Sequence, residues 1–209
     1  FAFMILDAGT AFGLVWMMTA RLRNQLEQQA RTDVLTGLLN RRALELNAQR
    51  ELAASRREHT PLAVLAMDLD HFKSLNDTYG HAAGDYALAA AARLLSQCLR
   101  NSDHLARLGG EEFVAILPAR DAERAAIVAE RLRSRLQQLR VDYDGHALAL
   151  TVSIGIATAG PGDNWPGLLQ RADVALYEAK RAGRNCIRAA APAQPQPGNI
   201  TPGIASASA

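Results

Sequence analysis

The sequence predicts an α/β or α+β domain, in which helices pack on a mixed sheet. Segments with helical and strand-like periodicity alternate between residues 41 and 188. The apolar run 62–69 has the length of a buried strand. The apolar runs 105–108 and 114–117 flank a glycine pair, as the two arms of an antiparallel hairpin do. These observations predict the fold class but leave the order of the strands open.

The helices are predicted from their apolar periodicity and from the residues at their ends. Asp85 is expected to be the N-cap of an amphipathic helix. The helix at 121–139 has acidic residues early and arginines late, which suits the helix dipole. The expected order is a helix at 41–58, a strand at 62–69, a helix at 85–99, the hairpin, a helix at 121–139, a strand at 147–158, a helix at 165–181 and a short strand at 185–188.

The N-terminal stretch is almost uniformly apolar and predicts a transmembrane or signalling helix at 1–20, since about 20 apolar residues cross a bilayer core. Arg21 and Arg23 follow it, which places the rest of the chain on the cytoplasmic side of an inner membrane. In a signal peptide the charges would precede the apolar stretch. A buried soluble helix is the alternative, because Asp7 interrupts the stretch. Because residue 1 is not Met, we expect a fragment of a longer membrane-anchored protein.

The rest of the chain divides into three predicted parts. Residues 21–32 form a polar linker helix with loose heptad spacing, a candidate coiled coil. Residues 33–188 form one domain, since a chain of this length allows a single core of about 100–200 residues. Residues 189–209 are rich in Pro, Gly, Ala and Ser, carry no charge and are expected to be disordered. The net charge of +2 is too small to indicate nucleic acid as a partner.

Two carboxylates stand at the end of the first predicted strand. Strand alternation places Asp68 and Asp70 on one side, where both could face one ion. Magnesium is commonly held by one or two carboxylates together with substrate phosphates, and Lys73 follows as a phosphate-binding charge. For Asp70 the alternative is helix capping. For Asp68 a purely structural role is less favoured, because a carboxylate that ends a buried strand needs a partner.

The predicted hairpin turn is acidic and has two successive residues without side chains. Gly109 and Gly110 leave the backbone open to a large ligand, and Glu111 supplies a hard oxygen ligand beside them. This combination suits a nucleoside triphosphate with its magnesium ion. The alternative is a solvated hairpin with incidental acids, and the second acidic cluster at Asp68 argues against it.

Four motifs follow one another along the chain: DVLTGLLNRR at 33–42, DLDHFKSLNDTYGHAAGD at 68–85, GGEEF at 109–113 and ADVALYEAKRAGRN at 172–185. Together and in this order they resemble the GGDEF family of diguanylate cyclase catalytic domains. The third signature position is Glu111 rather than Asp, a variation that active members tolerate and that keeps the oxygen ligand. The resemblance implies a palm-like, ferredoxin-related nucleotidyl cyclase fold with a central mixed sheet flanked by helices.

The resemblance implies an enzyme that condenses two GTP molecules into cyclic di-GMP and releases two pyrophosphates. It implies two Mg²⁺ ions per active site, with Mn²⁺ as a substitute, held by Asp68, Glu111 and the Leu69 carbonyl. Glu112 is expected to hold the second metal ion or to help deprotonate the attacking hydroxyl. The residues expected to be catalytic are Asp68, Lys73, Glu111 and Glu112.

The resemblance also implies a nucleotide site. Asn76 and Asp85 match the pair that recognises the guanine edge. Lys73, Lys180 and Arg184 are expected to bind phosphates, and the spacing of the last two predicts that both lie on one helix face. The expected substrate-binding residues are Phe72, Asn76, Asp85, Gly109, Gly110, Lys180 and Arg184.

An inhibitory product site is expected just before the hairpin. Arg100 and Asp103 precede the signature at the family's spacing, and Arg131 resembles the secondary arginine of that site. Arginine can bond a guanine edge or a phosphate bidentately, which suits a cyclic dinucleotide. An ordinary exposed ion pair is the alternative, because Arg-x-x-Asp is common on protein surfaces.

Each domain is taken to bind one GTP, so the expected catalytic unit is a homodimer, with cyclic di-GMP as product and inhibitor. Three alternatives stay open. A catalytically inactive cyclic di-GMP receptor would usually have lost the signature carboxylates. A cyclase with another base preference would have changed Asn76 or Asp85. A structural membrane module leaves both carboxylate clusters unexplained.

Overall fold

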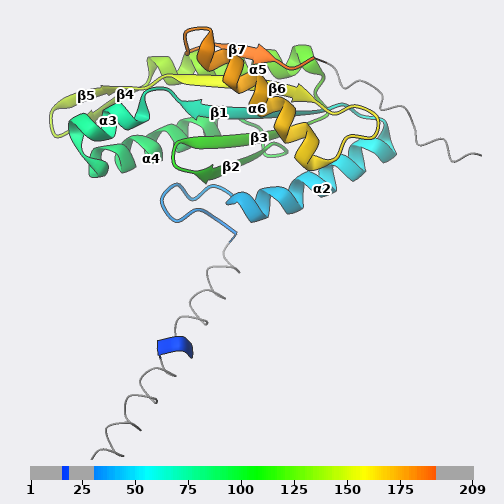
Figure 1. The fold of residues 1–209 in the computed structure, drawn as a ribbon, viewed down its shortest axis with the longest axis horizontal. Coiled ribbons are helices and arrows are strands. Elements are labelled where there is room, and N and C mark those ends of the chain that lie inside the picture. The colour runs from blue at the N-terminus through cyan, green and yellow to red at the C-terminus, as the bar shows by residue number, and fades with distance from the viewer. Residues whose placement is uncertain (1–15, 19–30, 192–209) are drawn as a thin grey trace, which may run out of the picture.

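A computed structural model describes residues 16–18 and 31–191 and shows a five-stranded sheet with helices on both faces (Figure 1). The strand order is β2-β3-β1-β6-β7; all neighbours are antiparallel except β6 and β7, and β4 and β5 form a separate ribbon. This architecture confirms the predicted fold class. The strands are β1 (Leu62–Leu69), β2 (His104–Gly109), β3 (Glu112–Pro118), β4 (Arg140–Tyr143), β5 (His146–Ala149), β6 (Val152–Thr158) and β7 (Ile187–Ala189), and the helices are α2 (Arg41–Glu58), α3 (Phe72–Tyr79), α4 (His81–Gln97), α5 (Ala122–Gln138) and α6 (Trp165–Arg181).

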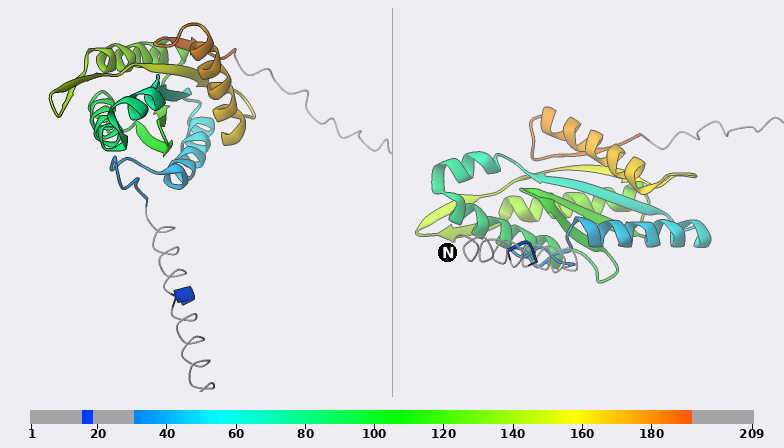
Figure 2. Two further views of the ribbon diagram at one scale, coloured as in Figure 1. Left: turned by 60° about the vertical axis from the view of Figure 1, so that its left-hand side comes forward. Right: turned by 60° about the horizontal axis from the view of Figure 1, so that its bottom comes forward.

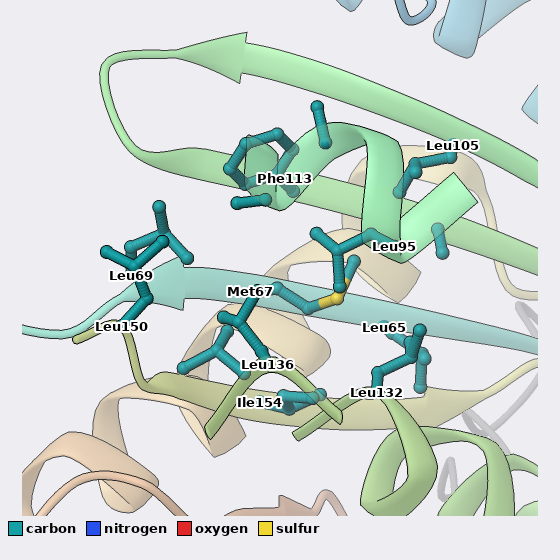
Figure 3. Packing of buried hydrophobic residues seen from close by; sticks show 14 of the residues in the cluster. Leu65, Met67, Leu69, Leu95, Leu105, Phe113, Leu132, Leu136, Leu150 and Ile154 are labelled. Carbon is teal, nitrogen blue, oxygen red and sulfur yellow. The ribbon is translucent and has the colours of Figure 1, made fainter. Parts of the chain in front are cut away.

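Strand β1 lies at the centre of the sheet and is buried along its whole length. Its odd-numbered residues, such as Leu65 and Met67, pack with α4 and α5, as Figure 3 shows. Its even-numbered residues, such as Val64 and Ala66, pack with α2 and α6 on the opposite face (Figures 1 and 2). A strand covered on both faces needs an apolar residue at every position, which explains the continuous apolar run.

The helix predicted at 85–99 begins earlier in the structure. Helix α4 starts at His81, so Asp85 lies in its second turn and the prediction that Asp85 is the N-cap is wrong. Gly80, at φ 85°, ends α3 and begins α4, because a positive φ turns the chain sharply between two helices. Helix α3 itself was absent from the predicted order.

The strand predicted at 147–158 is divided between β5 and β6. Strand β5 pairs with β4 across a turn in which Asp144 (φ 50°) and Gly145 (φ 76°) both have positive φ. Asp-Gly is a strong hairpin signal. Apolar periodicity alone does not reveal it, so the separate strand β5 was missed. The last strand starts at Ile187, not at residue 185, because the residues before it form a left-handed turn. The predictions at 41–58, 62–69 and 165–181 agree with α2, β1 and α6.

The predictions for 1–20, 21–32 and 189–209 fall almost entirely outside the described residues. Within the described ranges, no helix reaches both the length and the apolarity that a bilayer crossing requires. Ala189 belongs to strand β7 and the Ala190 N–H donates to the Ile156 carbonyl at 2.7 Å, so the prediction that disorder begins at residue 189 is wrong. The transmembrane or signalling helix, the linker helix and the rest of the disordered tail stay predictions.

Candidate nucleotide and metal site

The hairpin tip between β2 and β3 lies beside the end of β1. The register of β1 and β3 places Asp68 opposite Glu112. The Leu69 N–H donates a hydrogen bond to the Glu111 carbonyl at 3.3 Å. Antiparallel pairing therefore brings residues more than forty positions apart in sequence to one edge of the sheet.

The hairpin tip is held by Arg107, which the sequence analysis did not single out. Its Nε donates to the Gly110 carbonyl at 2.8 Å, and its Nη1 lies 3.1 and 3.2 Å from the two carboxylate oxygens of Asp33. Burial alone would raise the pKa of Asp33, but hydrogen bonds from Thr36 and Arg107 outweigh it and lower that pKa. Gly109 and Gly110, at φ 147° and 52°, adopt conformations that L side chains rarely accept. The turn thus needs both its glycines and this brace.

Asp68 is buried at this edge and only partly neutralised. Asp68 is 7% exposed, and the Lys180 Nζ lies 2.7 Å from its Oδ2. Burial raises the pKa of the Asp68 carboxyl, the Lys180 ammonium opposes this, and the charges of Glu111 and Glu112 raise it further. The negative charge is therefore held at an energetic cost that a bound cation would relieve.

The acids of this edge suit a cation that is shared with phosphates. Within the described residues, no three His, Cys, Asp or Glu side chains form a ready-made metal cage. Mg²⁺ commonly takes one or two carboxylates from the protein and completes its coordination with phosphate oxygens and water. Asp68, Glu111 and the Leu69 carbonyl are oxygen ligands of this type, so the residues fit Mg²⁺ bound together with a nucleotide.

Asp70 has a structural environment instead. Its carboxylate accepts hydrogen bonds from the Ser153 hydroxyl at 2.6 Å, the Thr151 hydroxyl at 2.8 Å and the Asn185 N–H at 2.9 Å. Both oxygens are used by the fold, so the expectation that Asp70 shares an ion with Asp68 is not supported. The capping alternative is wrong as well, because the N-cap of α3 is His71 and has no side-chain cap bond.

The turn after α6 carries Arg184 and is fastened by Asn185. Gly183, Arg184 and Asn185 all have positive φ (110°, 63° and 44°). Asn185 is held by two hydrogen bonds. Its backbone N–H donates to Asp70, and its side-chain Oδ1 accepts from the Arg133 Nη1 at 2.8 Å. Helix α6 ends one residue after Lys180. The prediction that Lys180 and Arg184 share one helix face is therefore wrong, because the chain leaves the helix between them.

Three polar side chains come from the two helices on either side of the turn at Gly80. The Asn76 Oδ1 is buried and has no hydrogen-bond partner among the described residues. A Cβ on Gly84 would lie 1.8 Å from this oxygen and 3.2 Å from Cζ of the buried Phe72. Asp85, next to Gly84, and Lys73, at the start of α3, are both exposed. An unsatisfied buried acceptor costs about 1–3 kcal/mol, which a ligand donating to it would recover.

A sequence profile described as "Diguanylate cyclase, GGDEF domain" matches residues 30–186. The chain belongs to the GGDEF family. Diguanylate cyclase DgcP of Pseudomonas aeruginosa is 42% identical over 163 residues, which cover 78% of this chain. The same match covers 24% of DgcP, so the chain spans about a quarter of that protein's length.

Solved GGDEF structures agree with the fold. The coiled coil and GGDEF domain of DgcB from Caulobacter crescentus, in complex with c-di-GMP, has a TM-score of 0.74 and 34% identity, covering 88% of this chain and 99% of that one. The active GGEEF domain of a diguanylate cyclase from Vibrio cholerae has a TM-score of 0.69 and 31% identity, covering 75% of this chain and 99% of that one. The predicted family fold is confirmed.

At the expected inhibitory site of this GGDEF domain, Arg100 and Asp103 do not form an ordinary exposed ion pair. The Asp103 side chain is 1% exposed, and Arg120 lies 3.0 Å from it in an ion pair. Asp103 also accepts from the Arg100 N–H at 2.9 Å, so its carboxylate shapes the turn that presents the exposed Arg100. The Arg131 Nη2 donates to the Cys98 carbonyl at 2.6 Å, which brings Arg131 to the same turn. Arg120 carried no sequence signal, because its partner lies 17 residues earlier.

Proposed function

We propose that this GGDEF domain is a diguanylate cyclase that joins two GTP molecules into cyclic di-GMP. In each step the ribose 3′-oxygen of one GTP attacks the α-phosphorus of the other, the bond to the β-phosphate oxygen breaks, and pyrophosphate leaves. DgcP is named for this activity, and the similar Vibrio cholerae domain is described as active. The observation that carries the proposal is the cluster of Asp68, Glu111 and Glu112 at one edge of the sheet.

Magnesium is the proposed cofactor, with two ions per site and Mn²⁺ as a substitute. Asp68, Glu111 and the Leu69 carbonyl would hold it. When bound, it supplies positive charge that lowers the pKa of the attacking hydroxyl and offsets charge on the phosphates. Glu112, opposite Asp68 in the sheet, is the residue we propose to accept the hydroxyl proton or to hold the second ion.

The nucleotide is proposed to extend from Asn76 to the acidic edge, the end of the sheet that carries Asp68, Glu111 and Glu112. The unpaired Asn76 Oδ1 and the exposed Asp85 carboxylate would accept from the donors of guanine, and Phe72 forms the apolar floor. Gly109 and Gly110 leave the backbone accessible to the phosphates. The proposed phosphate-binding side chains are Lys73, Lys180 and Arg184.

The catalytic unit is proposed to be a homodimer, because the reaction needs two nucleotides and each domain offers one guanine pocket. Residues 21–32 would form a coiled coil that sets how the domains meet. The similar DgcB structure, which includes a coiled coil, supports this arrangement. Residues 1–20 would anchor the dimer in the inner membrane with the catalytic domains in the cytoplasm.

The test is incubation of the purified chain with GTP and Mg²⁺, followed by chromatographic separation of the nucleotides. Cyclic di-GMP is expected from the parent and none from Glu111→Ala, with GTP consumption and pyrophosphate release in a ratio of one to one. If the parent makes no product even at high protein concentration, the cyclase proposal fails. Tight binding of cyclic di-GMP in that case would favour an inactive receptor.

Product inhibition is proposed to act through Arg100, Asp103 and Arg131. Arg100→Ala should raise the cyclic di-GMP concentration that halves the rate by at least about tenfold, since a bidentate arginine contact is worth about 1.5–3 kcal/mol. The initial rate without product should not change. Unchanged inhibition in this variant would contradict the assignment.

A further inference from the structure

The carboxylate of Asp103, a residue of the proposed product site, is already occupied by a neighbouring arginine. The Asp103 side chain is 1% exposed, and the Arg120 Nη2 lies 3.0 Å from its Oδ2 and 3.4 Å from its Oδ1. The Arg100 N–H donates to the same Oδ2 at 2.9 Å. Within the part of the chain that the structure describes, Arg120 is the only hydrogen-bond partner of Oδ1. Arg120 therefore covers the oxygen that the turn itself does not use.

The ion pair that covers Asp103 is buried and incomplete. Arg120 is 5% exposed, and a single guanidinium nitrogen faces both carboxylate oxygens. In the stronger fork geometry, two guanidinium nitrogens each bind one oxygen. The Arg120 Nε is buried and, among the described residues, has no hydrogen-bond partner. Because an unpaired buried donor destabilises this arrangement, Arg120 leaves Asp103 at a smaller free-energy cost than a complete pair would require.

A cavity of about 290 Å³ lies beside this pair. Asp103 and the exposed Arg100 line it, together with residues 37–39 and the end of α4, whereas Arg120 is not among its lining residues. Ligand sites usually measure roughly 300–1,000 Å³, so this cavity suits one base of a dinucleotide better than the whole molecule. The N1–H and 2-amino group of guanine are adjacent donors that a carboxylate can accept. A guanine in the cavity would therefore meet a carboxylate that is turned toward Arg120.

We propose that Arg120 sets the affinity of this chain for cyclic di-GMP, because it competes with a guanine of the product for the Asp103 carboxylate. The inference rests on the proposed product site and names the residue that regulates it. When the product binds, its guanine donors replace Arg120 on Oδ1, while the Arg100 N–H stays on Oδ2 and keeps the turn. The released guanidinium then bonds water or a phosphate oxygen of the product. Because the product must displace an ion pair, its apparent affinity falls in proportion to the fraction of domains in which that pair is open.

The test compares Arg120→Gln with the matched control Arg124→Gln, which removes the same charge from the first turn of α5. The Arg124 side chain is 71% exposed and lies 4.0 Å from Asp121, which is also exposed. Arg120→Gln keeps an N–H donor for Asp103 but not the charge, and thermal unfolding of each variant checks that the fold is intact. The measured quantity is the dissociation constant of cyclic di-GMP, from isothermal titration calorimetry. It needs no turnover, so it tests the inference even if the cyclase proposal fails.

Arg120→Gln should bind the product at least about tenfold more tightly than the parent, since a hydrogen bond between charged groups is worth roughly that factor. Arg124→Gln should bind it no more tightly than the parent. The direction of the change is decisive, because cyclic di-GMP is an anion and the loss of a nearby positive charge would by itself weaken its binding. Adding Asp103→Asn to Arg120→Gln should remove most of the gain, since only one of the two polar atoms of an amide accepts.

Three results would overturn the inference while leaving the cyclase intact. Arg120→Gln could bind the product no more tightly than the parent, which would make Arg120 a support of the turn alone. Arg124→Gln could gain affinity to the same extent, which would assign the effect to net charge. The gain could survive the addition of Arg100→Ala, which would place it outside the product site. Unchanged binding in Arg100→Ala alone would contradict the proposed product site on which the inference rests.

Discussion

The two acids at the end of β1 lie two residues apart, are equally buried, and have opposite environments. Asp68 and Asp70 are each 7% exposed. Asp68 has one cationic partner, Lys180, and two further acids whose charges raise its pKa. Asp70 accepts three hydrogen bonds from other parts of the fold. Burial does not separate a functional acid from a structural one; what separates them is whether the fold has already used the oxygens.

The two regions can be named by their members. The acidic edge consists of Asp68, Glu111 and Glu112, whose like charges are held together by strand register. The tether consists of Asp70, Thr151, Ser153 and Asn185, whose hydrogen bonds fasten the turn that carries Arg184. The acidic edge therefore lowers the stability of the fold in the absence of ligand, whereas the tether raises it.

The largest expected effect is that of Asp68→Asn on catalysis. We expect the rate to fall on the order of 10³-fold, as when a major electrostatic contact is removed. We also expect the melting temperature to rise. Because the pKa of Asp68 is raised in the folded state, its ionised form destabilises the fold above its ordinary pKa, and this cost disappears at lower pH. Initial rates and thermal unfolding at neutral and acidic pH check this. A lower melting temperature at neutral pH would contradict it.

The tether should respond in the opposite way. Asp70→Asn leaves a buried donor or acceptor unsatisfied, so the free energy of unfolding should fall by about 1–3 kcal/mol. GTP affinity should also fall, because the turn that positions Arg184 loosens, but turnover at saturating GTP should persist. Denaturant unfolding and the separation of kcat from KM measure these effects.

A double-mutant cycle controls this prediction. If Asp70 acts on GTP through Arg184, the loss of affinity in Asp70→Asn combined with Arg184→Ala should be smaller than the sum of the two single losses. Strict additivity would show that the tether and Arg184 are independent.

A smaller effect is expected at the proposed guanine site. In Gly84→Ala the new Cβ would lie 1.8 Å from the Asn76 Oδ1, so the Asn76 side chain must move. The expected cost is about 1–3 kcal/mol in unfolding free energy, with weaker GTP binding. Asn76→Ala combined with Gly84→Ala removes the clash and should recover the stability but not the binding. A stability loss that persists in the double variant would point to Phe72 instead.

The smallest effect is a change in acid sensitivity at the hairpin brace. The pKa of Asp33 is lowered in the fold, so its ionised form adds stability above its ordinary value of 3.8, and that stability is lost as the pH falls through the lowered value. Asp33→Asn should therefore unfold at a lower temperature than the parent at neutral pH, and the difference should shrink in acid. A constant difference at all pH values would mean that the charge of Asp33 is not what matters.

Local signals were sufficient for much of the fold. Helix α2 begins after Asn40, whose side chain accepts from the Ala43 N–H, and β1 is a continuous apolar run. The sequence prediction failed where turn residues decided the outcome, at Gly80 before α4 and at Asp144-Gly145 between β4 and β5. Periodicity reports which face of an element is buried, but backbone conformation at one or two residues decides where the element ends.

The residues of the candidate site were predicted from their motifs, whereas the arginines that hold the turns of the site in place were not predicted. Asp68 and Glu111 stand in motifs, but their proximity follows from strand register. Three arginines hold the turns of the site: Arg107 the hairpin, Arg120 the turn at Arg100 and Arg133 the turn after α6. In a chain whose basic residues are nearly all arginine, no local pattern distinguishes these three, because their partners Asp33, Asp103 and Asn185 lie 74, 17 and 52 residues away.

The most direct test of the difference between Asp68 and Asp70 is the Mg²⁺ dependence of the affinity for a GTP analogue that cannot react at the α-phosphorus, measured in the parent, Asp68→Asn and Asp70→Asn. The parent and Asp70→Asn should both bind the analogue more tightly as Mg²⁺ is added, and Asp68→Asn should have lost most of this dependence. Loss of the Mg²⁺ dependence in Asp70→Asn, with its retention in Asp68→Asn, would contradict the assignment of the two acids.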